Sequence, residues 1–157
     1  FPTRRSSDLI FESKDIDCYK GELVSLMQNV LADNITQPYP EDLAEQYVGK
    51  MPGYISDGSA IIVGAVSDDK LVGFSWAYEL KIFGERRIHI DMIGVNPDFR
   101  RNGIARRLVE MQIEESKRRN ISIIEAMTTK ANENSYNWFH SMGFKDERVK
   151  VKLELNK

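Results

Sequence analysis

The chain has 157 residues, of which 41% are hydrophobic and 29% charged, a balance typical of a single soluble globular domain. With a net charge of −2, the chain as a whole does not attract polyanions, so any anion site has to be local. The single cysteine excludes an internal disulfide and a cysteine-cluster metal site, which favours a cytoplasmic setting without a bound metal. No apolar run reaches the roughly 20 residues of a membrane helix, so no membrane partner is expected.

The chain opens with FPTRRSSDL, which has no apolar core of the kind found in a secretory signal. We expect residues 1–8 to be a non-native or disordered segment, and residues 9–157 to form one domain.

The first half of the chain predicts two helices followed by strands. A short strand is expected over 9–13, and apolar residues at helical spacing predict a helix over 17–33, which the prolines of TQPYPED end. A second helix is expected over 41–50, followed by a loop in MPGYISDGS, which is rich in Gly, Pro and Ser. Strands are then expected over 60–66, 71–82 and 87–95, and their short turns predict an antiparallel meander.

The second half predicts a crossover. The strongest helix pattern covers 103–119, and the apolar run ISIIEAMTT (121–129) predicts a buried strand. A strand, helix and strand in this order favour a parallel crossover. A further helix over 132–142 and an alternating strand over 149–155 complete a mixed α/β sheet.

The turn before the strong helix carries four arginines around a glycine, in NPDFRRNGIARRLVE (96–110). A nucleoside triphosphate loop is excluded because G-x-x-x-x-G-K-[ST] is absent. A DNA-reading helix is disfavoured because the helix mixes glutamates with its arginines and lysines, so no nucleic-acid partner is expected. A pyrophosphate cradle fits, since the free N–H groups of a helix start bind anions and Gly103 permits close approach. A basic turn before an amphipathic helix, without any bound anion, would give the same sequence pattern.

Two motifs in order resemble those of the GNAT-type N-acetyltransferases. The cofactor motif [QR]-x-x-G-x-[GA] is matched by RRNGIA (100–105), which follows a strand that ends in Val95. The second motif, N-x-x-A-x-x-[LF]-Y-x-x-x-G-F, is matched in part by NENSYNWFHSMGF (132–144). The order of the expected elements from residue 9 onward also agrees with that family.

The resemblance implies a GNAT-like fold that binds acetyl-CoA at the splay between the strands near 87–95 and 121–129. Backbone groups of Ile93, Gly94 and Val95 would pair with the pantetheine arm and supply an oxyanion donor. The pyrophosphate would bind at Arg100, Arg101, Asn102, Gly103, Ile104 and Ala105. On the second helix, Asn132, Ser135 and Phe139 would line the cofactor, although Asn132 would serve equally well as a helix cap.

Transfer of an acetyl group to an amine needs a base that takes up the proton of the amine. Asp91 is the first candidate, because an acid within an apolar strand is unusual and the family often has Glu at this position. Glu79 and then His89 follow. We expect Ser75 and Glu79 to meet His89 and Asp91 across the strand pair. A structural role for Asp91, as a partner of Arg86 or Arg87, is the alternative.

At the position that would protonate the leaving thiolate, the family commonly has Tyr, whereas this chain has Phe139. Tyr136 lies one helical turn earlier and is the candidate acid. The alternatives are protonation of the thiolate by a water molecule and its departure without an acid, since a thiol has a pKa of about 8.5.

The acceptor is expected to be a small-molecule or peptide amine, bound around 32–58 and 81–87 with the aromatic side chains of Tyr39, Tyr54, Trp76 and Tyr78. The sequence thus predicts an acetyl-CoA-dependent N-acetyltransferase, monomeric or homodimeric. A non-catalytic acyl-CoA-binding regulatory module, which the Phe139 departure favours, and a structural domain with a vestigial site are the alternatives.

Overall fold

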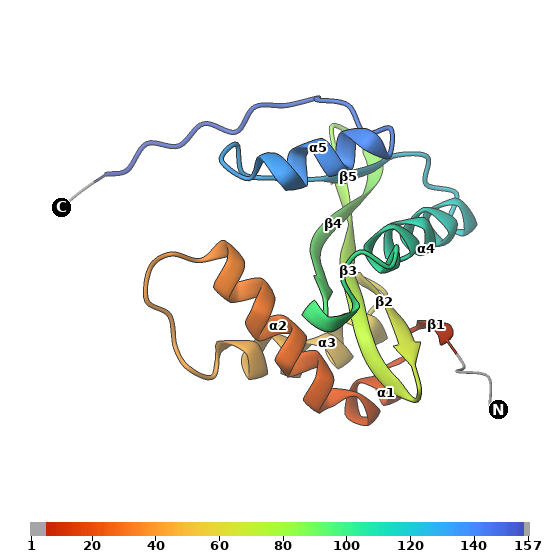
Figure 1. Cartoon of the computed structure of the whole chain (residues 1–157). Coiled ribbons are helices and arrows are strands. Elements are labelled where there is room, and N and C mark those ends of the chain that lie inside the picture. The colour runs from red at the N-terminus through yellow and green to blue at the C-terminus, as the bar shows by residue number, and fades with distance from the viewer. Residues whose placement is uncertain (1–5, 156–157) are drawn as a thin grey trace. The chain divides into compact units, whose positions relative to one another are not determined.

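The computed structural model of the protein describes residues 6–155 (Figure 1). The described chain divides into two compact units, one that ends at Met127 and one that begins at Thr128, and each is described by itself. That residues 9–157 form one domain stays a prediction. Within the described range, no helix is long and apolar enough to cross a membrane.

Unit 1 contains a five-stranded sheet whose spatial order follows the chain. Strands β1 to β4 are antiparallel, and β5 runs parallel to β4. The predicted mixed α/β sheet, with a meander followed by a strand–helix–strand crossover, is therefore confirmed. The elements in chain order are β1 (Ser6–Ile10), α1 (Ser13–Cys18), α2 (Lys20–Asn34), α3 (Leu43–Ser56), β2 (Ala60–Ser67), β3 (Lys70–Ile82), β4 (Glu85–Val95), the 3₁₀ helix η1 (Pro97–Phe99), α4 (Ile104–Arg118) and β5 (Ile124–Ala126).

Two tight turns set the register of the meander. Asp68 and Asp69 join β2 to β3, Phe83 and Gly84 join β3 to β4, and all four have positive φ. Two-residue turns of this conformation match the twist of the strands that they connect. The second turn pairs Ile82 with Glu85, and this pairing fixes every partner toward the middle of the hairpin.

The register corrects the expected pairing across β3 and β4. Tyr78 lies opposite His89, whereas Glu79 lies opposite Ile88 and Ser75 lies opposite Ile93. Ser75 and Glu79 are therefore not the direct cross-strand partners of His89 and Asp91 that the sequence predicted. The reason is that cross-strand partners share a face of the sheet, and the turn decides which residues become partners.

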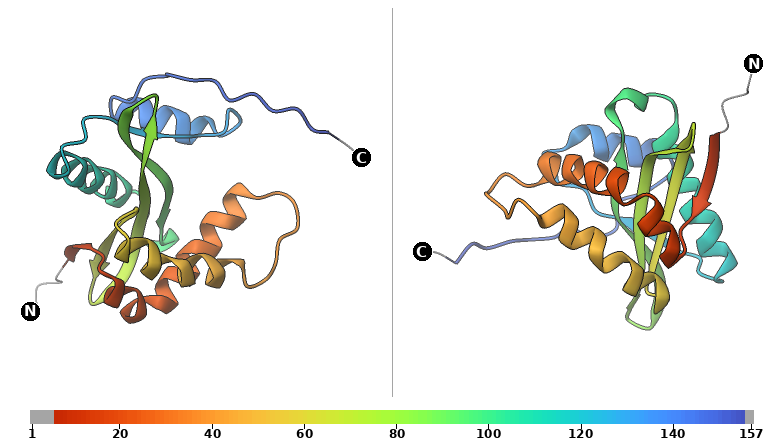
Figure 2. Two further views of the ribbon diagram at one scale, coloured as in Figure 1. Left: turned by 180° about the vertical axis from the view of Figure 1, so that it is seen from behind. Right: turned by 90° about the horizontal axis from the view of Figure 1, so that it is seen from below.

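Helices cover both faces of the sheet (Figure 2). On one face, the helices α1 to α3 pack on Phe74 and Trp76 of β3 and form a single hydrophobic cluster with β2. On the other face, α4 lies against the sheet, where Ile104 and Leu108 approach Gly73. The side chain of Gln112 is fully buried there and donates to the carbonyl oxygen of Ile61 at 3.1 Å.

The helical region differs from the prediction in two places. The helix expected over 17–33 is divided at Tyr19 into α1 and α2. The expected loop over 51–59 is helical as far as Ser56, so α3 continues through Pro52. Tertiary contacts outweigh the local preference of these residues: Met51 is fully buried, and the hydroxyl of Ser13 in α1 donates to the carbonyl oxygen of Pro52 at 3.0 Å.

The first strand begins earlier than expected. The prediction of disorder for residues 1–8 is wrong for residues 6–8, which pair with β2 from Ser6 opposite Ser67 to Asp8 opposite Ala65. Residues 1–5 lie outside the described range. Ordering of residues 6–8 follows from the backbone hydrogen bonds that β2 offers at the edge of the sheet.

Unit 2 contains the helix α5 (Glu133–Ser141), close to the predicted helix over 132–142. The strand predicted over 149–155 is wrong, because these residues belong to none of the five strands assigned within 6–155. Alternation alone does not make a strand, which needs a neighbouring backbone for its hydrogen bonds. The apolar side chains of this segment are exposed: Val149, Val151, Leu153 and Leu155.

Two glycines allow a direct test of the packing in unit 1. A methyl group at Gly64 would lie 2.6 Å from the Phe11 ring and 2.7 Å from Leu71, whereas one at Gly49 in α3 would meet nothing within 4 Å. We expect Gly64→Ala to lower the free energy of unfolding by about 1–3 kcal/mol through overpacking. Gly49→Ala should raise it by about 0.5–1 kcal/mol through helix propensity. Urea unfolding followed by circular dichroism measures both, and equal effects would contradict this packing.

Candidate functional site

A pocket of about 240 Å³ opens in unit 1 where α3 meets the sheet. It brings together parts of α3, β2, β3 and β4, so residues far apart in the sequence share one wall. Aromatic and acidic side chains dominate the lining, which consists of Tyr54, Ser59, Ala60, Trp76, Tyr78, Glu79 and Asp91. Two of the three base candidates, Asp91 and Glu79, and three of the four predicted acceptor aromatics therefore belong to this pocket.

Asp91 occupies a β-bulge in β4. Ala77 pairs with Ile90 and Trp76 pairs with Met92, so Asp91 has no partner on β3. A bulge bends its strand and redirects side chains, and bulges are frequent beside active sites. The inserted residue places the carboxylate of Asp91 in the wall of the pocket that Trp76 and Tyr78 also line.

The environment of Asp91 changes its acidity. The residue is open to solvent at one side, while neighbouring protein atoms crowd its carboxylate. This partial desolvation raises the pKa of Asp91 above its ordinary value, and the nearby His89 opposes the shift by lowering it. A carboxylate with a raised pKa accepts a proton more readily than an ordinary aspartate, which is the property that a general base needs.

Glu79 differs from Asp91 in being held by a cation. Its Oε1 lies 2.6 Å from Nε of Arg86 in an ion pair across the β3–β4 hairpin. The hydrogen bond from Arg86 lowers the pKa of Glu79 and outweighs the opposite effect of desolvation. Glu79 therefore holds a proton less readily than Asp91, although both line the pocket.

His89 lies beside the pocket in a buried polar network. Its Nδ1 is 3.0 Å from Oε1 of Glu125, its direct partner across the parallel β4–β5 pair. Nη1 of Arg87 donates to the other oxygen of Glu125 at 2.9 Å, and the Arg87 side chain is 6% exposed. His89 also lies against the ring of Tyr78, with ring centroids 5.1 Å apart. The network joins β4 to β5 immediately before the bulge.

The start of α4 has the features of the predicted cradle. Asn96 ends β4, and its side chain accepts from the backbone N–H of Asp98 at 2.9 Å. Arg101 and Gly103 then adopt left-handed conformations with φ of 67° and 73°. Gly103 is the N-cap of α4 and has no side chain to cap it, so the first N–H groups of the helix receive no side-chain acceptor from this position. Such a helix start attracts anions.

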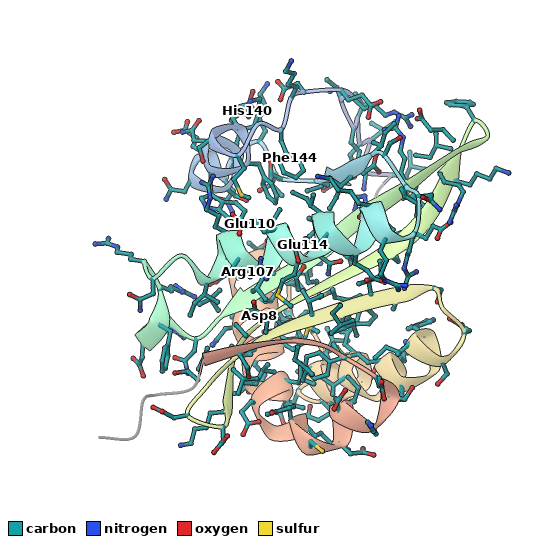
Figure 3. The ribbon with its side chains drawn as sticks, turned by 90° about the vertical axis from the view of Figure 1, so that its right-hand side faces the viewer. Asp8, Arg107, Glu110, Glu114, His140 and Phe144 are labelled. Atoms are coloured by element: carbon teal, nitrogen blue, oxygen red, sulfur yellow. The ribbon has the colours of Figure 1, made fainter. Side chains whose placement is uncertain are left out.

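The arginines of this segment divide into two groups. Arg106 and Arg107 are held by carboxylates: Arg106 lies 3.5 Å from Glu110, and Arg107 binds Asp8 at 2.7 Å and Glu114 at 3.0 Å (Figure 3). Arg100 lies 3.8 Å from Asp33, and both are exposed. Arg101 makes no ion pair within residues 6–155 at the 4.0 Å limit. The turn thus leaves Arg101, and in part Arg100, able to meet an added anion.

The sheet opens beside the cradle. Strand β5 pairs with β4 only from Ile88 to Ile90, so it covers three residues instead of the nine expected from the sequence. Beyond Ile90, the edge of β4 that faces away from β3 has no strand partner among the described residues. The backbone of Ile93, Gly94 and Val95 lies in this unpaired stretch.

The remaining predicted residues belong to unit 2. Asn132 caps α5, since its side chain accepts from the backbone N–H of Ser135 at 3.1 Å. The hydroxyl of Tyr136 donates to Asp146 at 2.8 Å, and this hydrogen bond raises the pKa of Tyr136. Phe139 packs against Phe144, with ring centroids 5.0 Å apart.

Residues 26–144 match the model of the acetyltransferase (GNAT) family, which covers most of the chain. The chain belongs to the GNAT acetyltransferase family. The predicted resemblance is therefore confirmed at the level of the family. No curated protein sequence matches this acetyltransferase at a significant level.

Solved structures share the fold of this acetyltransferase at low sequence identity. Aminoglycoside N-acetyltransferase AAC(6')-Iy in complex with CoA aligns with a TM-score of 0.77 at 16% identity, over 98% of each chain. A predicted acetyltransferase with acetyl-CoA from Clostridium acetobutylicum gives 0.75 at 19% identity, over 96% of each chain. The ribosomal-protein-alanine N-acetyltransferase from Brucella melitensis biovar Abortus 2308 gives 0.73 at 20% identity, over 96% of this chain and all of the other.

Some residues around the site of the acetyltransferase were missed by sequence reasoning. Glu125 lies within the strand expected over 121–129 and has no separate expected role, and Ser59 and Ala60 lie where a loop ends and a strand is expected to start. The signal for Glu125 was its charge within the apolar run ISIIEAM, the same signal that identified Asp91. No cluster of three or more His, Cys, Asp or Glu suited to a metal occurs within residues 6–155.

The Arg87 network supports a prediction about stability. Arg87→Met removes the cation that faces the half-buried Glu125, so we expect the free energy of unfolding to fall by about 2–4 kcal/mol. The matched control is Arg86→Met, whose side chain is 49% exposed and whose loss should cost less than about 1 kcal/mol. Urea unfolding measures both variants. Equal effects would mean that the buried network does not stabilise the β4–β5 junction.

Proposed function

We infer that the protein transfers the acetyl group of acetyl-CoA to a primary amine by direct attack in a ternary complex, with Asp91 as the general base. The observation that carries this proposal is the bulge that puts Asp91 into an aromatic pocket, immediately before the unpaired edge of β4. A proton acceptor, an acceptor pocket and an open backbone edge thus adjoin within one unit.

The donor would bind along β4 and the start of α4. The unpaired backbone from Ile93 to Val95 supports pairing with the pantetheine arm, since an exposed strand edge offers both N–H and carbonyl groups. The N–H groups at the start of α4 and the side chain of Arg101 would hold the pyrophosphate. Acetyl-CoA supplies the activated acetyl group as a thioester.

The reaction begins with the amine in the pocket. Asp91 takes one proton from the ammonium group, and the freed amine nitrogen attacks the thioester carbon. Backbone N–H groups near Ile93 to Val95 would stabilise the oxyanion that forms. The carbon–sulfur bond then breaks, the electron pair leaves with the sulfur as the thiolate of CoA, and the amide nitrogen gives up its second proton to the solvent or to that thiolate.

The leaving thiolate has one candidate acid. Phe139 carries no proton to donate, so Tyr136 remains the candidate. To act, Tyr136 must exchange its hydrogen bond to Asp146 for one to sulfur, and the raised pKa of its hydroxyl makes it a weaker acid. Departure of the thiolate without an acid is consistent with a thiol pKa of about 8.5.

Asp91→Asn tests the base. We expect kcat to fall by about 10²–10⁴-fold, because the variant cannot accept a proton. In the wild type, the rate should fall as the pH drops through the raised pKa of Asp91, since only the ionised carboxylate accepts a proton. The variant should lack that acidic limb. Thiol release with acetyl-CoA and a panel of primary amines measures both effects.

The matched control is Glu79→Gln, which changes the other carboxylate of the same pocket. Its kcat should stay within about tenfold of the wild type, because Arg86 already occupies Glu79. A larger loss in Glu79→Gln than in Asp91→Asn would assign the base to Glu79 instead. Tyr136→Phe, in the same assay, reports on the candidate acid.

Arg101→Ala tests the cradle without turnover. We expect the Kd of acetyl-CoA to rise about tenfold, because a charge-assisted hydrogen bond contributes about 1.5–3 kcal/mol. Arg106→Ala is the control, since Arg106 is engaged by Glu110, and its Kd should change little. Calorimetry measures both. Equal affinities for the two variants would contradict the cradle, and tight binding without thiol release from any amine would favour the non-catalytic acyl-CoA-binding module.

A further inference from the structure

The pocket beside Asp91 has a distinct charge. Two carboxylates line it, and none of its described lining residues is cationic. Glu79 shares its charge with Arg86, whereas no ion pair to Asp91 is found within the 4.0 Å limit among residues 6–155. The pocket therefore offers one uncompensated negative charge to a ligand, placed at the bulge.

Aromatic rings form the rest of the wall. Trp76 is 7% exposed, and its ring is fixed by Tyr47 and Tyr54, whose centroids lie 6.3 Å and 6.1 Å away. The ring of Tyr78 lies against the ring of His89. The face of an aromatic ring carries partial negative charge and attracts cations, and several rings around one pocket suit an ammonium group.

The pocket is small. Its volume of about 240 Å³ lies below the roughly 300–1,000 Å³ of sites that enclose drug-sized ligands. An unbranched alkyl chain has no polar group apart from its amine, so aromatic rings can cover it without loss of hydrogen bonds, whereas an amino sugar would place several hydroxyl groups against the same rings.

We propose that this pocket selects an unbranched aliphatic primary amine in its ammonium form, held by the rings of Tyr54, Trp76 and Tyr78 and directed at Asp91. The chain belongs to a free diamine or to a lysine side chain, which share this chemistry. Acetyl transfer to this amine rests on the proposed function, whereas binding of the amine in the pocket does not. At neutral pH such an amine is protonated, since the pKa of a lysine side chain is about 10.4.

Fluorescence of Trp76 measures the binding step without acetyl-CoA. The chain has two tryptophans, so Trp138→Phe leaves Trp76 as the sole reporter. The probes are n-pentylamine, its neutral counterpart n-pentanol, and glucosamine. We expect n-pentylamine to bind about tenfold more tightly than n-pentanol, since only the ammonium group is attracted by the ring faces and by the carboxylate of Asp91. Glucosamine should bind more weakly than n-pentylamine.

Tyr54→Leu in the same background removes one ring from the pocket. Tyr54 is 42% exposed, so the fold should tolerate the change. We expect the affinity for n-pentylamine to fall about three- to fivefold, as an exposed cation–π contact predicts, with no change for n-pentanol. Tyr39→Leu is the control, because Tyr39 is similarly exposed and does not line the pocket.

Three results would overturn the proposal. These are equal affinities for n-pentylamine and n-pentanol, equal or tighter binding of glucosamine, and absence of any fluorescence change with n-pentylamine. Cadaverine and Nα-acetyl-lysine amide then distinguish a free diamine from a lysine side chain, and binding of both no tighter than glucosamine would also overturn it. Selective binding of n-pentylamine without thiol release would refute the acetyl transfer and leave the pocket assignment in place. Thiol release that favours glucosamine would support the acetyl transfer and refute the pocket assignment.

Discussion

The site depends on one interruption in the β3–β4 ladder. The two-residue turn at Phe83 and Gly84 fixes the register of the hairpin, and the inserted Asp91 shifts that register by one residue halfway along β4. Before the bulge, β4 pairs with β5, and after it the outer edge of β4 has no strand partner in the part of the chain that the structure describes. Asp91, which carries the carboxylate, thus lies where β4 changes from a strand inside the sheet to an open edge.

Around this bulge, the neighbouring elements are held rigidly, while Asp91 between them is exposed to solvent. The Arg87–Glu125–His89 network ties β4 to β5 on one side, and the hydrophobic cluster under Trp76 holds β3 against α2 and α3 on the other. Polar groups that are buried and fully paired restrict motion, because any displacement leaves a charge without its partner. Asp91 lies between these two supports with one side open to solvent, which leaves room for a ligand.

The basic segment shows how tertiary contacts sort similar residues into different roles. Four arginines lie within eight positions, and their charge alone gives no reason to separate them. In the fold, Arg107 is held by Asp8 of β1 and Glu114 of α4, so its charge stabilises the edge of the sheet. Arg101 lies in the left-handed turn that precedes α4 and makes no such pair within the described residues. Only the second kind of arginine remains available for an anion.

The sequence alone determined the class of fold, the order of the elements and the two motifs that identify the family, because periodicity and turn residues act over short distances. It also singled out Asp91, since an acid in an apolar strand is visible without a structure. The tertiary structure decided the register, the bulge, the continuation of α3 through Pro52 and the absence of a strand over 149–155 within the described chain. These features arise from contacts between distant segments: a helix is extended by packing on its neighbours, and a strand exists only where another backbone accepts its hydrogen bonds. The pocket of Tyr54, Trp76 and Asp91 is the clearest case, because three separate elements supply it and no local pattern brings them together.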